Sequence, residues 1–221
     1  MRRPNAIPKA TVFRLSLYLR ELTELGEKEV KTVSSQKLAK GLGLTDAQVR
    51  KDLAYFGQFG YPGVGYHVDE LAAELKRILG TNHMWDVVLI GCGNLGTALA
   101  AYKGFDRQGF RIVGAFDSSP EKIGRKVGDL TVQSMDELAG TVSRTGSRIA
   151  ILCVPNASAQ TVVDRAAAVG IRGILNFAST SITLPTGVVQ NSVDLAIRLE
   201  QLTFQLTKKP KKQKKQKPSG S

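Results

Sequence analysis

Three glycines have the clearest chemical meaning in this chain: Gly91, Gly93 and Gly96 follow an apolar run that begins at Asp86. Where a strand turns into a helix, glycines at this spacing permit a tight bend, let a pyrophosphate approach the backbone, and let the helix pack closely on the strand. The unpaired N–H groups at the start of that helix favour a negative ligand. The spacing therefore predicts a dinucleotide site, and the alternative is a turn with a purely structural role.

A carboxylate stands where the adenosine ribose of such a nucleotide is expected. A second strand, predicted over residues 110–116, ends at Asp117, which comes 21 residues after Gly96. In dinucleotide-binding folds an acidic residue about 20 positions after the glycines binds the ribose hydroxyls. We therefore expect Asp117 and the whole turn to hold the nucleotide. The remaining residues of the turn are Cys92, Asn94 and Leu95.

Strands and helices alternate after residue 86, which predicts an α/β domain built on a Rossmann-type doubly wound parallel sheet. Apolar runs at residues 148–154 and 171–177 indicate buried strands, and a helix over residues 157–169 joins them. Ligands bind beyond the carboxyl ends of the strands in such sheets. The residues at these ends complete the expected nucleotide site: Asn156, Asn176 and Ala178.

The chain before residue 80 predicts a helix-turn-helix. A helix is expected over residues 8–25, and two shorter ones follow over 34–43 and 47–56, with a turn at Gly43 and a capping box from Thr45 to Gln48. The last of these helices leaves polar, basic and aromatic side chains toward solvent: Gln48, Arg50, Lys51 and Tyr55. This pattern favours DNA binding. The alternative is a small helical bundle with a solvated face.

The segment over residues 57–67 combines glycines, a proline and aromatic residues, which indicates a β-hairpin with a flexible tip. A helix-turn-helix followed by a hairpin is a winged helix. In that fold the second helix enters the major groove, and the hairpin reaches the adjoining backbone or minor groove. A further helix, capped by Asp69 and ended by Gly80, completes the predicted domain.

The last predicted helix, over residues 193–206, is apolar around more of its circumference than one domain face requires. It should pack between the two domains or against a second subunit, and we favour a second subunit. Residues 207–221 contain seven Lys and no acidic residue. They predict a disordered tail that either adds salt-sensitive attraction to a polyanion or has no role. The predicted parts are a winged helix (1–80), a linker (81–85), a nucleotide domain (86–190), a terminal helix (191–206) and a tail (207–221).

Composition predicts a cytoplasmic protein that does not enter a membrane. The 221 residues are 42% hydrophobic and carry a net charge of +12, and no uncharged apolar run reaches the roughly 18 residues that cross a bilayer. The start of the chain lacks the apolar stretch of a signal peptide. The two cysteines, Cys92 and Cys153, suit a reducing compartment and have no metal-ligand spacing, so we expect no metal. Both are expected to be buried, with oxidation sensing by Cys92 as the alternative.

A glycine turn of this kind makes an oxidoreductase the default expectation, but a fold does not settle a function. Hydride transfer to a carbonyl group needs a residue that handles a proton. The two histidines, His67 and His83, lie in the predicted wing and linker, and no Ser/Tyr/Lys triad spacing occurs near the sheet. The sequence therefore favours a protein that binds a nucleotide without turning it over. A nucleotide-binding enzyme or a CoA-binding subunit is the alternative.

Several motifs in register give the chain a family resemblance. They are Gln48-Val-Arg-Lys-Asp-Leu-Ala-Tyr-Phe-Gly57, Gly63-Val-Gly-Tyr66, Gly91-Cys-Gly-Asn-Leu-Gly96 with Ala98-Leu-Ala-Ala-Tyr-Lys-Gly-Phe105, and Gly173-Ile-Leu-Asn-Phe-Ala178. With them the chain resembles the Rex family of redox-sensing transcriptional repressors. The resemblance implies a bacterial homodimer whose winged helices bind a palindromic double-stranded operator, with the C-terminal helix swapped between subunits. It also implies that NADH releases the protein from DNA, whereas NAD⁺ does not.

The resemblance also implies roles for single residues in the nucleotide site. The glycines and Asp117 would hold the adenosine diphosphate, with Asp117 favouring NAD over NADP because a carboxylate repels a 2′-phosphate. Arg20, Tyr102 and Asp194 match the positions that sense the nicotinamide. An oxidised, positively charged ring would attract the Asp194 carboxylate, and a neutral reduced ring would leave it to pair with Arg20.

For DNA contact we name Arg50 and Lys51 first, Gln48 and Tyr55 second, and Arg14 as a phosphate contact. A merely solvated charge is the alternative for Arg50 and for Arg14. The sequence departs from the family pattern in two places. Tyr61-Pro62 stands where many relatives carry an arginine that enters the minor groove, so the Lys-rich tail would have to supply some of the lost affinity. Ser179 replaces the proline that usually follows Asn-Phe-Ala.

Overall fold

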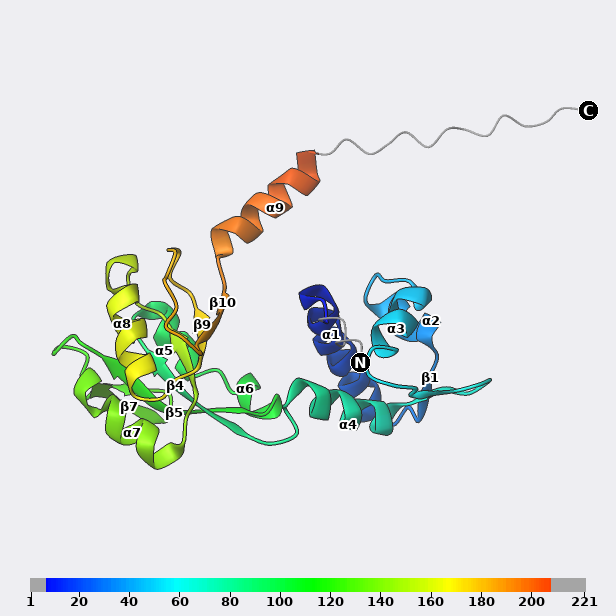
Figure 1. Cartoon of the computed structure of the whole chain (residues 1–221), viewed down its shortest axis with the longest axis horizontal. Helices are drawn as coiled ribbons and strands as arrows, with labels where there is room; N and C mark the ends of the chain where they lie inside the picture. Colours follow the sequence, from blue (N-terminus) through cyan, green and yellow to red (C-terminus); the bar gives the residue numbers. More distant parts are fainter. Residues whose placement is uncertain (1–6, 208–221) are drawn as a thin grey trace, which may run out of the picture. The chain divides into compact units, whose positions relative to one another are not determined.

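The computed structural model describes residues 7–207 and divides the chain into two compact units (Figure 1). We call them the winged-helix unit, which runs to Trp85 and includes Lys103–Arg111, and the sheet unit, which contains Asp86–Tyr102 and the chain from Ile112 onward. The two units are therefore not simply consecutive in the chain, because Lys103–Arg111 follows part of the sheet unit but belongs to the winged-helix unit. This segment is held by a hydrogen bond from the Trp85 N–H to the Gly109 carbonyl (2.8 Å).

The winged-helix unit contains the predicted helices and hairpin in the predicted order, together with a two-residue strand and a short helix that were not predicted. It contains α1 (Lys9–Glu27), β1 (Thr32–Val33), α2 (Ser35–Gly41), α3 (Asp46–Leu53), β2 (Gly60–Tyr61), β3 (Gly65–His67), α4 (Val68–Leu79) and the short α6 (Gly104–Arg107).

The core of this unit forms between α1 and α4. Leu15, Tyr18 and Leu22 lie three and four residues apart on α1, so they share one face, and all three are fully buried. Leu71 and Leu75 of α4 belong to the same core cluster. Each leucine buried in this way contributes roughly 1.5–3 kcal/mol to folding. The pair of helices is thus the platform on which α2 and α3 rest.

The turn between α2 and α3 depends on a glycine and on two caps. Gly43 has φ of 65°, a left-handed conformation that glycine adopts without strain. The Ser34 side chain accepts a hydrogen bond from the Lys37 N–H at the start of α2, and Thr45 accepts one from the Gln48 N–H at the start of α3. These local contacts confirm the predicted helix-turn-helix and fix where α3 begins.

The wing is a three-stranded antiparallel sheet in the order β1, β3, β2. Gly65 has φ of 93°, and a Cβ there would lie 2.6 Å from the Val33 carbonyl oxygen, so the close approach of β1 and β3 requires glycine. The next helix begins two residues earlier than expected, because His67 is the residue before α4 and Asp69 lies in its first turn.

The sheet unit contains seven strands in the order β10, β9, β8, β4, β5, β7, β6. Without β6, the other six strands have the order typical of a dinucleotide-binding sheet. Strand β6 lies at the edge and is antiparallel to β7. The elements are β4 (Trp85–Ile90), α5 (Asn94–Ala100), β5 (Phe110–Asp117), β6 (Lys126–Val127), β7 (Leu130–Ser134), the 3-10 turn η1 (Met135–Glu137), α7 (Leu138–Thr145), β8 (Ile149–Leu152), α8 (Asn156–Ala168), β9 (Gly173–Asn176), β10 (Val189–Ser192) and α9 (Leu195–Thr207).

The core of the sheet unit forms where alternate strand residues meet α7 and α8. Val88 and Ile90 of β4 face the same side as Ala150 and Leu152 of β8, as their register requires. Val163 of α8 packs in the same cluster, and Figure 1 shows α7 and α8 beside the strands. Because residues on the opposite face are buried as well, the strands are apolar throughout. This fixes the carboxyl ends of β4, β5 and β8 on a rigid base.

Three strands of this sheet were not predicted: β6, β7 and β10. They are two to five residues long and mostly polar or partly exposed, so they lack the apolar run that identified the others. The terminal helix α9 begins at Leu195 and has no buried residue. The Lys-rich segment that was predicted to be disordered lies outside the described residues.

Candidate functional site

A cavity of about 750 Å³ opens in the sheet unit beyond the carboxyl ends of β4, β5 and β8. Its walls include Gly91 and Gly93 from the turn after β4, Asp117 at the end of β5, and Cys153 after β8. The strand order reverses direction between β4 and β8, which is where doubly wound sheets bind their ligands. The cavity is therefore the candidate nucleotide site.

The glycine turn has the geometry that its spacing predicts. Gly91 has φ of 98°, and a Cβ there would overlap the Cys153 carbonyl oxygen. A Cβ on Gly96 would overlap the Gly91 carbonyl oxygen, so this glycine is needed for α5 to approach the strand. Gly93 differs, because a Cβ there would meet no atom within 4 Å. The first and third glycines are required by the fold, and the second leaves open space in the cavity.

Helix α5 starts at this open position. Gly93 precedes it, no side chain caps its first turn, and Asn94 and Leu95 line the cavity. The first N–H groups of a helix are available to a ligand when no side chain accepts from them. A pyrophosphate fits this arrangement of open backbone and uncapped helix start. The observed geometry is thus compatible with the phosphates of a dinucleotide.

Asp117 is buried and held by three donors. Its Oδ2 accepts hydrogen bonds from the Cys92 N–H (2.8 Å) and from Lys122 Nζ (2.9 Å), and its Oδ1 accepts one from the Ser119 N–H (2.9 Å). Burial by itself would raise the pKa of Asp117, but these hydrogen bonds outweigh burial and lower the pKa below its ordinary value. The carboxylate is therefore charged and faces the cavity at the position expected for a ribose contact.

The two thiols are poorly suited to redox chemistry. Burial raises the pKa of Cys92 to about 11, and the nearby Asp117 charge acts in the same direction. Burial also raises the pKa of Cys153 to about 11. Because the thiolate is the reactive form, both side chains are almost fully protonated near neutral pH. Cys92 is buried as expected, whereas Cys153 is only partly buried and lines the cavity. The raised pKa of the Cys92 thiol argues against Cys92 as an oxidation sensor.

The other residues expected at the nucleotide do not line the cavity. Asn176 is buried at the end of β9, where its Oδ1 accepts from the Ala178 N–H (2.8 Å) and its Nδ2 has no partner. Asn156 begins α8 and donates to the Ser179 carbonyl (3.2 Å). Tyr102 is exposed just after α5. Of the predicted set, the structure brings together the turn and Asp117.

The residues expected to sense the nicotinamide lie on different units. Arg20 is exposed on α1 of the winged-helix unit and pairs with Glu24 at 3.8 Å. Asp194 precedes α9 in the sheet unit, and its Oδ1 accepts hydrogen bonds from the Ala196 N–H (2.9 Å) and the Ile197 N–H (3.2 Å). Asp194 is therefore the cap of α9.

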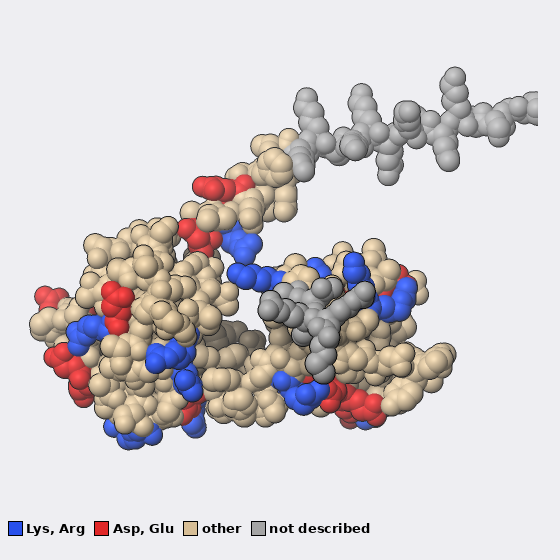
Figure 2. Space-filling model, viewed as in Figure 1, with Lys and Arg blue, Asp and Glu red and all other residues tan. Residues whose placement is uncertain are grey.

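The outer face of α3 presents cationic side chains, and Tyr55, which was expected in the same helix, lies just beyond its end at Leu53. Arg50, Lys51 and Tyr55 are exposed, and Arg50 Nη1 also bonds to Asp46 Oδ2 (2.7 Å) and Ser35 Oγ (3.0 Å). Exposed pairs of this kind are weak in water, so Arg50 can exchange its partner for a base or a phosphate. Figure 2 shows Lys and Arg on both units, so basic charge alone does not identify the DNA surface.

A buried network joins α3 to α1 and uses two residues that were expected to contact DNA. The Asp52 carboxylate accepts hydrogen bonds from Arg14, Tyr18 Oη (2.8 Å), Thr11 Oγ1 (3.2 Å) and Gln48 Nε2 (2.9 Å). Burial alone would raise the pKa of Asp52, and the bonds from Arg14, Tyr18 and Gln48 lower it on balance. The hydrogen bond to Asp52 raises the pKa of Arg14. The guanidinium of Arg14 is thus engaged inside the fold, and the phosphate contact expected of Arg14 stays a prediction.

The wing carries Tyr61 where the family pattern has a nearby arginine. The Tyr61 ring lies edge-on to His67, with ring centroids 5.1 Å apart, and its hydroxyl is 3.5 Å from Glu70 Oε2.

Within residues 7–207 no group of three or more His, Cys, Asp or Glu side chains is placed to hold a metal. No helix in the same range is long and apolar enough to cross a bilayer.

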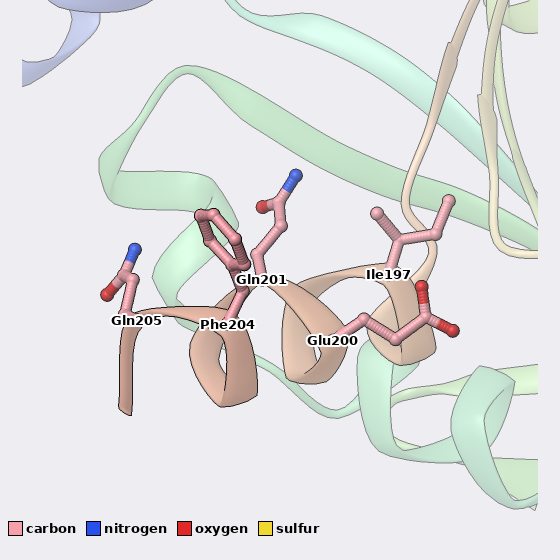
Figure 3. A pocket seen from close by; sticks show the side chains of 5 residues that line it. All are labelled: Ile197, Glu200, Gln201, Phe204 and Gln205. Carbon is pink, nitrogen blue, oxygen red and sulfur yellow. The ribbon is translucent and has the colours of Figure 1, made fainter. Parts of the chain in front are cut away.

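Helix α9 exposes an apolar surface. Figure 3 shows that Ile197, Gln201 and Phe204 project from the same side of the helix. Together with Glu200 and Gln205 they line a hollow, and all five residues belong to α9. A hollow formed along a single helix does not enclose a small ligand, so it has the character of a contact surface.

Sequence reasoning missed two contributors to these sites. Lys122 was not among the predicted site residues, although its Nζ lies 2.9 Å from Oδ2 of Asp117, the carboxylate that the sequence did identify. Asp52 was left out, although it lies with Val49 and Leu53 on the inner face of α3, where a charged side chain needs a partner. That position, together with Arg14 four residues before Tyr18 on α1, was the available signal.

Two protein-family models match the chain. One, described as a CoA binding domain, matches residues 82–180. The other, described as "Putative DNA-binding protein N-terminus", matches residues 6–54. The first match contains the cavity, and the second contains α1 to α3.

Whole-chain relatives and solved structures are also similar to this chain. It is 50% identical over 200 residues to the "Redox-sensing transcriptional repressor Rex" of Carboxydothermus hydrogenoformans, covering 90% of this chain and 96% of that protein. It is 46% identical over 202 residues to the protein of that name from Streptomyces coelicolor, covering 91% and 78%. The crystal structure of "RSP in complex with beta-NAD+ and operator DNA" superposes with a TM-score of 0.85 at 37% identity, over 91% of this chain and 93% of that one. RSP "in complex with beta-NADH" superposes with a TM-score of 0.81 at 35% identity, over 91% and 95%.

Proposed function

The chain belongs to the Rex family of redox-sensing transcriptional repressors, and we propose that it binds a palindromic operator as a homodimer and leaves the DNA when NADH occupies the sheet-unit cavity. Its relatives are named as repressors, and the chain has the corresponding non-enzymatic role. One observation carries the proposal: the same chain contains a helix-turn-helix, whose α3 exposes Arg50 and Lys51, and a cavity lined by Gly91, Gly93 and Asp117.

The nucleotide would be held by residues that already have the required geometry. The backbone at Gly93 and the start of α5 would bind the pyrophosphate, and Asp117 would accept from the adenosine ribose. When bound, the nicotinamide supplies a ring whose charge differs by one unit between NAD⁺ and NADH. No histidine or tyrosine lines the described cavity, which supports binding without turnover.

We propose that α3 makes the base contacts through Arg50 and Lys51, with Tyr55 beside them. Arginine and lysine in the major groove donate to guanine, and exposed aromatics pack on the backbone. Gln48 is half-buried and donates to Asp52, so a base contact by Gln48 requires it to exchange that bond. Arg14 acts in our proposal through the position of α3, because its guanidinium is bonded to Asp52.

Dimerisation through α9 is supported by its exposed apolar residues. At least half of the surface of each of six large side chains is exposed: Leu195, Ile197, Leu199, Leu202, Phe204 and Leu206. Leu195, Leu199, Leu202 and Leu206 form a row at helical spacing, and Ile197 and Phe204 lie on the opposite side. Such a row on a helix with no buried residue favours a protein partner. A second copy of the chain offers the same row, and a symmetric dimer would present two winged helices to a palindromic site. We propose that the α9 helices are swapped in this dimer.

The redox switch is proposed to involve Arg20, Tyr102 and Asp194. An oxidised nicotinamide would attract the Asp194 carboxylate, and the neutral reduced ring would release it to Arg20. One unit charge at about 4 Å is worth on the order of 4 kcal/mol at an effective dielectric near 20. Allosteric coupling typically requires about 1–3 kcal/mol, so one charge is sufficient. Because Arg20 belongs to the winged-helix unit, the new pair would change the separation of the two α3 helices on DNA.

The parts of the chain follow from this proposal. We assign residues 1–80 to DNA binding, 81–85 to a linker, 86–190 to nucleotide binding, 191–206 to dimerisation and 207–221 to a basic tail. A cytoplasmic location fits a protein that meets both DNA and the NADH pool.

The test is an operator titration by fluorescence anisotropy with equal concentrations of NADH and NAD⁺. We expect NADH to weaken operator binding and NAD⁺ to leave it largely unchanged. Equal shifts by both nucleotides would reject the sensor. The variant pair Arg50→Ala and Arg77→Ala makes a matched control, because Arg77 is an exposed arginine of α4 that pairs with Glu74. Operator affinity should fall in the first and persist in the second.

A further inference from the structure

The tip of the wing is exposed and carries no charge. Figure 1 shows the hairpin, in cyan, projecting from the rest of the winged-helix unit. Residues 57–66 contain no Lys, Arg, Asp or Glu. Tyr61 and Val64 are each 51% exposed at the two sides of the tip, and Pro62 between them is exposed as well. The wing therefore presents an apolar surface, whereas the exposed face of α3 is cationic.

A tight turn makes this tip rigid. The Val64 N–H donates to the Tyr61 carbonyl (3.1 Å) across Pro62 and Gly63. Gly63 has φ of 76°, and a proline followed by a residue of positive φ is the pattern of a type II turn. Because proline fixes its own φ, the turn has few alternative conformations. A rigid surface loses little conformational entropy on binding, so the tip is suited to a contact of fixed shape.

The base of the wing is fixed beside α3. Tyr66 of β3 is buried in the core cluster that also contains Val49 and Leu53 of α3. Burial raises the pKa of Tyr66, and the charge of Arg50 acts in the opposite direction. The guanidinium on the outer face of α3 is thus close enough to influence the wing. The hairpin therefore keeps a constant place beside the helix that meets the duplex.

The neighbours of Tyr61 leave its ring, and not its hydroxyl, for contact with DNA. The hydroxyl lies 3.5 Å from Glu70 Oε2, and a carboxylate at this point repels a phosphate. The ring touches His67 edge-on, and half of the residue stays exposed. Phosphates are bound by cations and hydrogen-bond donors, whereas apolar side chains act as wedges in the minor groove. The chemistry of the tip therefore fits the minor groove better than the phosphate backbone.

We propose that the wing of this chain enters the minor groove of the operator as an uncharged wedge, in which the Tyr61 ring packs on deoxyribose and base edges and Pro62 and Val64 complete the apolar surface. This inference rests on the DNA binding of the proposed function. The wedge adds affinity that does not depend on counterion release, because it neutralises no phosphate. The cations of α3 supply the salt-dependent part of the affinity, and the wing supplies a part that salt does not weaken.

The experiment measures the affinity for DNA against salt concentration by fluorescence anisotropy. The probe is a labelled palindromic duplex that the unmodified full chain selects from a random-sequence library. Four variants are compared with that chain. Tyr61→Ala removes the ring, and Tyr61→Phe keeps the ring without the hydroxyl. Pro62→Arg places a cation on the tip, and Pro62→Gln is its uncharged control.

We expect Tyr61→Ala to bind the duplex at least about fivefold more weakly, the scale of an aromatic side chain packed on nucleotides. Its slope of log K against log salt should stay that of the unmodified chain, because no phosphate contact is lost. Tyr61→Phe should keep the affinity. Pro62→Arg should steepen the slope relative to Pro62→Gln, by roughly 0.9 for one phosphate neutralised per subunit. Hydroxyl-radical cleavage should reveal minor-groove sugars that the unmodified chain protects and Tyr61→Ala leaves open.

Any of four outcomes would overturn the wedge. They are an unchanged affinity of Tyr61→Ala, equal weakening by Tyr61→Phe, equal slopes for Pro62→Arg and Pro62→Gln, and the same protected sugars with and without the ring. Thermal melting of each variant verifies that it is folded. If the chain binds the duplex but NADH does not release it, the redox part of the proposed function fails while the wedge stands. If the chain selects no duplex, both fail.

Discussion

Replacing Asp52 by Asn should destabilise the winged-helix unit strongly although the two side chains have nearly the same shape. The Asp52 side chain is 1% exposed, and its two oxygens accept from Arg14, Tyr18, Thr11 and Gln48. An Asn amide has one oxygen, so its NH₂ group would face donors and the Arg14 charge would lose its partner. Removing one member of a fully buried pair costs about 3–5 kcal/mol. Since the Arg14 side chain is 20% exposed, water relieves part of this, and we expect a loss of about 2–4 kcal/mol.

The loss is measured by urea unfolding followed through Trp85, the one tryptophan of the chain. Its indole N–H donates to the Gly80 carbonyl (2.6 Å) at the end of α4, so its fluorescence reports on the winged-helix unit. Asp46→Asn is the matched control on the same helix, because Asp46 is exposed and pairs only at the surface with Arg50. The control should unfold close to the unmodified chain.

The contribution of Asp52 to the free energy of unfolding of the winged-helix unit should depend on pH. The pKa of Asp52 is raised by burial but lowered on balance by its hydrogen bonds, so it lies below the ordinary value of about 3.9 in the folded state. A group of this kind stabilises the fold above the unfolded pKa and loses its contribution as pH falls through the folded pKa. The difference between the unmodified chain and Asp52→Asn should therefore be full at neutral pH and narrow below about pH 4. Two results would refute the reasoning: a loss of unfolding free energy in Asp52→Asn under about 0.5 kcal/mol at pH 7, or a difference between the two proteins that grows as the pH falls.

Three further predictions concern the nucleotide site, the switch and the dimer. Gly93→Ala should fold normally, because a Cβ there meets nothing within 4 Å, but it should bind NADH at least about tenfold more weakly, because the methyl group occupies the phosphate approach. Unchanged affinity in a nucleotide titration would contradict this. Gly96→Ala, whose Cβ would overlap the Gly91 carbonyl, should instead lower the melting temperature. Asp194→Asn keeps an amide oxygen to cap α9 but loses the charge, so it should bind NADH and NAD⁺ and fail to distinguish them in the operator titration; retained discrimination would remove Asp194 from the switch. Leu199→Asp, on the exposed row of α9, should give a monomer in sedimentation equilibrium, and an unchanged dimer mass would place the interface elsewhere.

Local patterns predicted most of the framework, because they depend on residues close together in the chain. The helix-turn-helix follows from helical spacing, from Gly43 and from side chains that cap the helix directly after them. In the glycine turn after β4, the steric limit at Gly96 is local because its Cβ would overlap the Gly91 carbonyl, whereas the limit at Gly91 comes from Cys153, which is distant in the chain. The fold class and the family, which rest on such patterns, are confirmed by the structure and by the relatives. The short strands β6, β7 and β10 escaped because they are ordered by pairing with neighbouring strands and not by their own apolar residues.

By itself, the sequence determined where the glycines must be glycines, which helix would present Arg50 and Lys51, and that Asp117 would end a strand beside the turn. The tertiary structure decided how the charges are used. Arg14 and Asp52 are 38 residues apart, and they meet only because α1 and α3 pack together. Lys122 reaches Asp117 only because a turn folds back toward the end of β5. The type of a side chain limits the bonds that it can make. The packing of elements that are distant in the chain determines its partner, and therefore whether it is available to DNA or bonded within the fold.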